Sequence, residues 1–216
     1  MKKSAWQAGL LLFFFAFLGG VLGFAQTETT VIARMGMRHV ATYHYFEVYQ
    51  ERCRWIAPDV VYIDFGKNNY REISIGGGAV LHNSTHWTIF QEVFFDQATG
   101  PGAHGALYLL PWTYIGYRIT PKVRGETAYF PLLPLNKAAR IQHIIERAKL
   151  EYDFKHFKVG AGYGAYQFGG DDWQHRPFLT TTFKGGRLGD LELWLQRLPG
   201  NHVQAQIRYR ISFQSR

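Results

Sequence analysis

The sequence predicts an all-β fold, an antiparallel transmembrane β-barrel of about ten strands, within a range of eight to twelve. Three observations lead to this prediction. Residues 203–213 alternate apolar and polar side chains, which gives a strand one apolar and one polar face. The chain opens with a basic and then apolar segment typical of export. Between these two segments, runs of about 8 to 12 residues are separated by turn residues.

The first 25 residues are typical of a cleaved secretory signal peptide. Lys2 and Lys3 supply the positive start, residues 10–21 form the apolar run, and Gly23-Phe24-Ala25 offers small residues at the two positions that a signal peptidase reads. An uncleaved anchor is disfavoured, because about 15 apolar residues are fewer than the roughly 20 that a spanning helix needs. We expect cleavage after Ala25, leaving residues 26–216 as a single barrel domain in the outer membrane.

The composition fits a membrane barrel. Aromatic residues make up 17% of the chain and the mean hydropathy is −0.18, as expected when only every second strand residue faces lipid. The net charge of +8 falls to about +6 without the two signal lysines. In an exported protein this excess points to outer-membrane lipid headgroups or a polar lumen, and not to nucleic acid. A single cysteine excludes an internal disulfide.

The strands can be placed in order along the chain. Residues 28–50 hold one long strand or a hairpin. The strands expected after it are 55–65, 70–82, 86–98, 105–119, 122–133, a segment ending at 154, 157–168, 177–183, 188–198 and 202–213. Residues 136–150 fit helical spacing about as well as strand spacing. We interpret this segment as the start of a strand because its second half alternates.

Two turns allow a prediction of strand register. Matching the apolar faces across Pro199-Gly200-Asn201 requires the numbers of paired residues to sum to an even value, such as 400, which gives a three-residue loop; a slip of one residue would move every leucine to the wrong face. The partners predicted here are Leu193 with Ile207, Leu195 with Ala205, Glu192 with Arg208 and Asp190 with Arg210. Across Lys155-His156 the same reasoning pairs Tyr152 with Val159, Leu150 with Ala161 and Asp153 with Lys158.

The polar faces of these strands carry many charges. In a soluble barrel a row of inward charges would be very costly, whereas the lumen of a membrane barrel is its polar side. We therefore predict a charge-paired lumen in a protein with a structural role or a role as a passive channel for small solutes. The interior charges of the predicted network are Glu72, Arg124, Glu126, Glu151, Asp190, Glu192, Arg208 and Arg210.

The C-terminal strand resembles the assembly signal of bacterial outer-membrane β-barrel proteins. That signal has a polar residue followed by two hydrophobic residues, the last one aromatic, and Gln206, Ile211 and Phe213 occupy these places. Arg208 stands where the signal usually has glycine. The resemblance covers about eight residues. It implies an outer-membrane location and the barrel assembly machinery as a partner, and it implies no activity.

Two other functions are compatible with parts of the sequence. His82 and Ser84 resemble the His-x-Ser pair of outer-membrane lipid A deacylases, in which an imidazole activates a hydroxyl for acyl transfer. A turn is the simpler interpretation, because Asn and Ser are common in turns. The third possibility is a secreted or periplasmic carrier barrel with an apolar cavity, like a lipocalin. The sequence shows no metal-ligand spacing, and we expect no cofactor.

Overall fold

The computed structural model describes residues 27–38, 42–66, 69–101 and 103–214. The predicted signal peptide, residues 1–25, lies outside this part of the chain. No helix among the described residues is long and apolar enough to cross a membrane.

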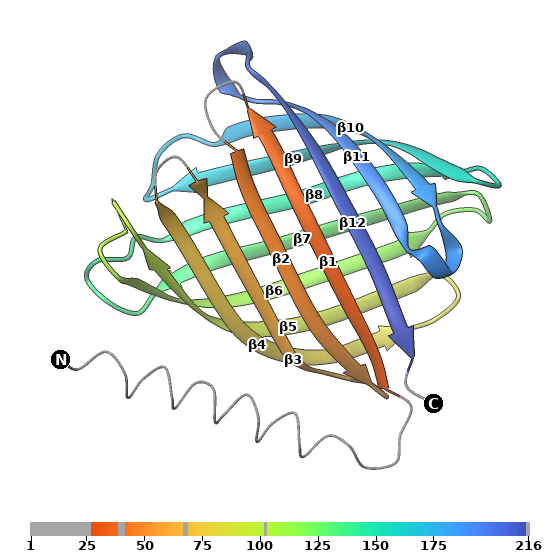
Figure 1. Cartoon of the computed structure of the whole chain (residues 1–216), viewed down its shortest axis with the longest axis horizontal. Coiled ribbons are helices and arrows are strands. Elements are labelled where there is room, and N and C mark those ends of the chain that lie inside the picture. Colours follow the sequence, from red (N-terminus) through yellow and green to blue (C-terminus); the bar gives the residue numbers. More distant parts are fainter. Residues whose placement is uncertain (1–26, 39–41, 67–68, 102, 215–216) are drawn as a thin grey trace.

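The described residues form twelve strands that close into one antiparallel barrel (Figure 1). Each strand pairs with its neighbours in sequence, and β1 pairs with β12 to complete the ring. The strands are β1 (Thr27–Arg38), β2 (Thr42–Arg52), β3 (Trp55–Phe65), β4 (Tyr70–Asn83), β5 (Trp87–Thr99), β6 (Ala106–Arg118), β7 (Val123–Pro134), β8 (Gln142–Asp153), β9 (Phe157–Phe168), β10 (Gln174–Lys184), β11 (Asp190–Arg197) and β12 (Val203–Gln214).

The barrel class is as predicted, but the number of strands is twelve and not about ten. Residues 28–50, for which one long strand was an alternative, belong to two paired strands, β1 and β2. The ambiguous segment 136–150 is a strand from Gln142 onward, and its first residues belong to the turn that follows β7.

Both predicted registers are confirmed. Across the turn at Pro199–Asn201, Leu193 pairs with Ile207 and Glu192 with Arg208. Across the turn between β8 and β9, Tyr152 pairs with Val159. The apolar alternation together with the short turns therefore predicted the alignment of these hairpins, because a slip of one residue would have turned leucines into the lumen.

The apolar faces of the strands point away from the barrel interior. Leu179, Leu195 and Phe95 are 62%, 56% and 67% exposed, whereas the inward Gln204 and Gln206 are buried. A carrier with a dry cavity needs the opposite arrangement, with its apolar side chains inside. The lipocalin-like alternative is therefore not supported, and the outer surface is suited to contact with lipid.

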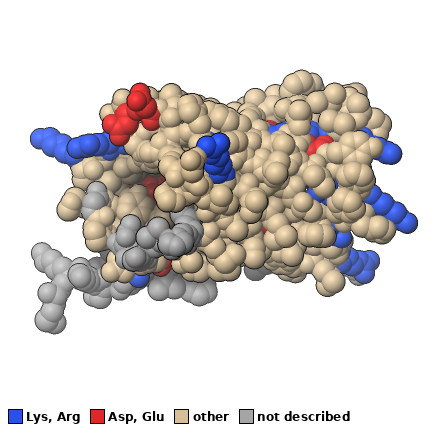
Figure 2. All heavy atoms as spheres, turned by 90° about the horizontal axis from the view of Figure 1, so that it is seen from above, with Lys and Arg blue, Asp and Glu red and all other residues tan. Residues whose placement is uncertain are grey.

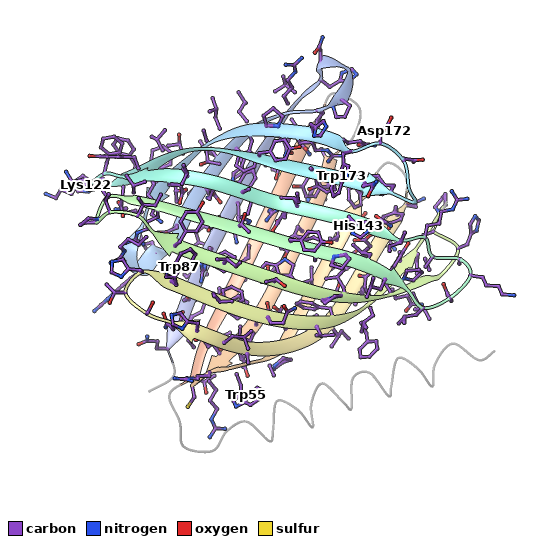
Figure 3. The ribbon with its side chains drawn as sticks, turned by 180° about the vertical axis from the view of Figure 1, so that it is seen from behind. Trp55, Trp87, Lys122, His143, Asp172 and Trp173 are labelled. Carbon is purple, nitrogen blue, oxygen red and sulfur yellow. The ribbon has the colours of Figure 1, made fainter. Side chains whose placement is uncertain are left out.

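Aromatic side chains lie on the outside toward both ends of the barrel. Figure 3 shows Trp87 toward the same end as Lys122, and His143 with Trp173 toward the end that carries Asp172. Exposed aromatic residues at these levels are typical of the two membrane interfaces. In Figure 2 most of the visible wall between the ends carries no charge, and most of the visible Lys and Arg side chains gather toward the ends.

We name the two ends by their connections. The turn end holds the links β2–β3, β4–β5, β6–β7, β8–β9 and β10–β11, and the loop end holds the links β1–β2, β3–β4, β5–β6, β7–β8, β9–β10 and β11–β12.

Candidate functional site in the lumen

One side of the lumen, along β8–β11, is filled by side chains. Gly160 and Gly162 face inward on β9 and let neighbouring side chains lie over its backbone. A Cβ atom at Gly162 would lie only 2.5 Å from Phe178 Cζ and 2.6 Å from Lys149 Cβ. Phe178 in turn stacks on Trp194, with ring centroids 4.2 Å apart, and both rings are buried. This packing leaves little room for solute along β9–β11.

Lys149 is the centre of an ion network beside these rings. Its Nζ lies 2.6 Å from Glu192 Oε1, 2.9 Å from Glu151 Oε1 and 3.2 Å from Glu126 Oε1. The same Nζ lies 5.6 Å from the ring centroid of Trp194. Its side chain is only 3% exposed, so the ammonium group has exchanged water for three carboxylates and an aromatic face.

A second part of the network crosses the lumen. Arg34 on β1 places its Nη2 2.7 Å from Glu146 Oε1 on β8. In the closed strand order these strands lie five places apart by one route and seven by the other, so this ion pair joins nearly opposite walls. Arg147 links it to the Lys149 part, because its guanidinium contacts Glu146 at 2.8 Å and Glu126 at 3.3 Å.

The network is balanced in charge. Arg208 completes it, with Nη1 3.3 Å from Glu192 Oε2. Among the described residues its members are four basic side chains, Arg34, Arg147, Lys149 and Arg208, and four acidic ones, Glu126, Glu146, Glu151 and Glu192. Mutual pairing removes their net charge, which is the condition under which buried ions are tolerated.

A bulge in β8 positions two of these residues. The pairing between β8 and β9 shifts between Ile145 and Ala148, so one strand carries extra residues at this point. Glu146 and Arg147, although adjacent in sequence, both join the network inside the lumen. Regular alternation would have sent one of them toward lipid.

The structure brings together only some of the predicted lumen residues. Glu126, Glu151, Glu192 and Arg208 belong to the network, including the predicted pair of Glu192 with Arg208. Asp190 and Arg210 are register partners, but Arg210 donates to Tyr49 Oη at 3.0 Å. The remaining two lie elsewhere.

Arg124 lies at the turn end, 3.7 Å from Asp153, and Glu72 lies on β4, where it accepts a 2.5 Å hydrogen bond from Tyr70. Four further members of the network, Arg34, Glu146, Arg147 and Lys149, were not predicted from the sequence.

The other side of the lumen is open. A cavity of about 1530 Å³ is lined by side chains of all twelve strands, with the largest share on β2–β6. Its lining includes Ser84 and His86 at the turn end and His104 and Lys137 at the loop end. The cavity therefore runs from one end of the barrel to the other, past the ion network.

Acidic side chains mark the open wall. Tyr45 donates a hydrogen bond to Glu47, and Ser74 Oγ donates to Asp96 Oδ1 at 2.6 Å. Asp59 on β3 and Glu92 on β5 lie within hydrogen-bonding reach of each other. Gly76 and Gly78 on β4 separate these two strands and place no side chain between them.

His82 and Ser84 lie at the β4–β5 turn. Ser84 Oγ accepts a 3.1 Å hydrogen bond from the Trp87 N–H and lies 3.3 Å from the Trp87 carbonyl oxygen. This is the turn role that the sequence suggested, and the acyl hydrolase alternative is not supported. In the described part of the chain, no group of three or more His, Cys, Asp or Glu side chains could hold a metal ion.

The residues of the C-terminal signal divide between the two faces of β12. Gln206 is buried in the lumen, where its Nε2 donates to Gln196 Oε1 at 3.0 Å. Phe213 is exposed on the outer face, paired with Thr29 of β1 near the turn end. The odd positions of this strand are outward and the even positions are inward, as predicted.

By sequence, the chain matches no protein-family model and no curated protein. Solved structures similar to it are outer-membrane channels. The KdgM porin gives a TM-score of 0.63 at 10% identity, over 85% of this chain and 99% of that porin. An outer-membrane channel from Pseudomonas putida F1 gives 0.56 at 10% identity, over 89% and 97%. Omp33 of Acinetobacter baumannii gives 0.55 at 8% identity, over 88% and 99%.

At this level of identity the likeness concerns the fold. It extends over nearly the whole length of each of these channels. Together with the closed strand order and the apolar outer wall, it agrees with the location expected from the sequence. The chain has the fold of outer-membrane β-barrel channels.

Proposed function

We propose that the protein is a passive channel that lets small polar solutes cross the outer membrane. The observation that carries this proposal is the cavity along β2–β6, which is lined by residues at both ends of the barrel. A barrel with a purely structural role has no need of such a passage, and its lumen could be filled all round as it is along β9–β11. Polar groups on the open wall suit hydrated solutes.

Comparison with a liganded neighbour supports a solute-binding lumen. The KdgM porin has been solved in complex with disordered oligogalacturonate, and that structure matches this chain with a TM-score of 0.61 at 10% identity. A barrel of this fold can therefore contain a polar solute.

The cross-lumen ion pair offers a test of the channel. Purified protein in a planar bilayer is expected to give discrete conductance steps. Replacing both Arg34 and Glu146 by alanine removes the bridge between β1 and β8, so the single-channel conductance is expected to rise. The matched control is the double alanine variant of Asp64 and Arg71, an ion pair of 3.4 Å in which neither side chain lines the cavity.

The control is expected to conduct as the wild type does. Folding of the wild-type barrel is checked by the change of its gel mobility on heating. If the folded wild-type protein gives no conductance steps, the channel function is contradicted. If the two double alanine variants have the same conductance, ions do not pass beside the Arg34–Glu146 ion pair.

We also infer that the protein is exported and assembled through the two signals in its sequence. The mature chain is expected to begin at Gln26, because Gly23-Phe24-Ala25 fits a signal peptidase site. N-terminal sequencing of the outer-membrane fraction checks this, and a mature chain beginning at Met1 would contradict it. Gln206, Ile211 and Phe213 are the residues that we expect the assembly machinery to recognise.

A further inference from the structure

Outside the ion network, the charged side chains that line the cavity are separated by sign. The acidic ones all lie on β2, β4 and β5, and they are Glu47, Glu51, Glu72, Glu92 and Asp96. The basic ones all lie between β6 and β12. Toward the turn end they are Arg118, Arg124, Lys158 and Arg210, and toward the loop end they are Lys137, Arg140 and Arg176. Within the described part of the chain, the cavity therefore has an acidic wall and a basic wall, with a small excess of basic groups.

The order of the strands places these two walls on opposite sides of the lumen. β4 and β10 are six places apart in the ring by either route, and β5 and β12 are five places apart by the shorter one. Glu72 and Arg176 are each the third residue of their strand counted from the loop end. Counted from the turn end, Arg210 is the fifth residue of β12 and Glu92 the sixth of β5. Charges of opposite sign therefore stand across the passage in both halves of the barrel.

The carboxylates of the acidic wall keep their charge. Hydroxyl groups donate to three of them, in the pairs Tyr45–Glu47, Tyr70–Glu72 and Ser74–Asp96. Glu92 lies within hydrogen-bonding reach of Asp59, so these two carboxyl groups share one proton and retain one negative charge. Among the described residues, none of the five acidic side chains forms an ion pair with a lysine or arginine.

Neutral partners also hold two arginines of the basic wall. Arg210 is exposed, and its guanidinium donates to Tyr49 Oη at 3.0 Å. The guanidinium carbon of Arg176 lies 3.9 Å from the ring centroid of Tyr166. Arg124 contributes less to this wall, because it keeps the ion pair at the turn end described above.

The two walls come near each other at Arg210. Glu47 and Glu51 are both electrostatic neighbours of this arginine. Neither of them forms a direct ion pair with it among the described residues, so a gap remains between the guanidinium and the carboxylates. A guanidinium presents a planar fork of donors that fits a carboxylate, whereas the glutamates fit an ammonium group. A solute that carries both groups can bridge this gap.

A simple ion does not gain in the same way from both walls. The wall that attracts a cation faces one that repels it, and the same holds for an anion. A zwitterion can turn its ammonium group to the acidic wall and its carboxylate to the basic wall, so both contacts are favourable.

We propose that the channel favours zwitterionic solutes of the amino-acid class, held transiently between Glu47 and Arg210. This inference rests on the proposed channel function and names its solute class.

L-alanine and lactamide provide the test, because they are isomers of similar size and only alanine carries separated charges. The swelling of proteoliposomes in an isotonic solution of each solute gives its rate of entry, after subtraction of the rate for liposomes without protein. Alanine is expected to enter faster than lactamide, although its charged groups are more strongly hydrated. Entry of alanine at the same rate or more slowly would overturn the inference and leave the channel function standing, whereas swelling in neither solute would overturn both.

Variants then locate the selectivity. Arg210→Gln and Glu47→Gln each remove one charge of the bridge. Each is expected to lower the alanine-to-lactamide ratio about threefold, which corresponds to about 0.6 kcal/mol and lies within the range for one charge pair in water. Arg187→Gln and Asp172→Asn are the matched controls, because both residues are exposed in connections between strands and lie outside the cavity lining. Neither control should change the ratio.

Folding of each variant is checked by the change of its gel mobility on heating. If one of the two bridge variants does not fold, the other carries the test, and the comparison of solutes in the wild type needs neither. Equal ratios in the wild type, a folded bridge variant and its control would overturn the assignment to Glu47 and Arg210.

Discussion

Replacing Lys149 by methionine is expected to lower the free energy of unfolding by about 3–5 kcal/mol, the range for breaking a buried ion pair. Methionine keeps most of the length of the side chain over Gly162 but removes the charge. Glu126, Glu151 and Glu192 would then face one another with no ammonium group between them. Urea unfolding of the protein in lipid vesicles, followed by tryptophan fluorescence, measures the loss.

Two further variants separate charge from packing. Lys155→Met changes a lysine in the exposed β8–β9 turn and is expected to leave stability unchanged. Adding Glu192→Gln to Lys149→Met removes one of the stranded carboxylates and should recover part of the loss. Equal stability of the two lysine variants would show that the network does not hold the barrel together.

Replacing Leu179 by arginine is the second large effect. Leu179 lies at the centre of β10, on the outer face, and is 62% exposed in the isolated barrel. In a membrane this exposed surface meets hydrocarbon, so a guanidinium there is expected to cost about 2–4 kcal/mol. The same urea titration in vesicles measures it.

Leu188→Arg is the matched control. Leu188 is 78% exposed but belongs to the short turn between β10 and β11, beyond the strand ends. Its substitution should cost much less, because the charge stays near headgroups and water. If both substitutions cost the same, the wall around Leu179 does not face lipid.

Strand faces and local register could be predicted from the sequence. Along β12 every second residue from Val203 to Phe213 is apolar, and this alternation alone distinguishes the outer from the inner face. Register followed at the hairpin around Gly200, because a three-residue loop fits the turn and a slip of one residue would move Leu193 and Leu195 off that face. Such predictions depend on neighbours in sequence.

The ion network could not be predicted in the same way. Arg34 and Glu146 are 112 residues apart in sequence and meet only because the barrel closes to a particular diameter. A bulge also breaks the alternation in β8, so a pattern of period two places Glu146 on the wrong face. The one pair predicted correctly, Glu192 with Arg208, joins adjacent strands.

The predicted number of strands was too low because the sequence does not mark the reversal between β1 and β2. From the sequence, residues 28–50 fit either one long strand or a hairpin. In the structure β1 ends at Arg38 and β2 begins at Thr42. Outward positions are odd-numbered in β1 and even-numbered in β2, but on β2 the tyrosines Tyr43 and Tyr45 face the lumen and His44 faces outward, so hydrophobicity does not mark where the chain reverses.

The uneven filling of the lumen has a consequence for how this chain can change. Phe178, Trp194 and Lys149 support the barrel from one side, while other side chains line the passage. Mutations on β2–β6 can therefore alter what passes without removing the supporting side chains, and a new specificity can arise by single steps that each leave a folded protein. The same division makes the barrel a starting point for a designed nanopore, in which the sensing wall is rebuilt and the supporting wall is kept.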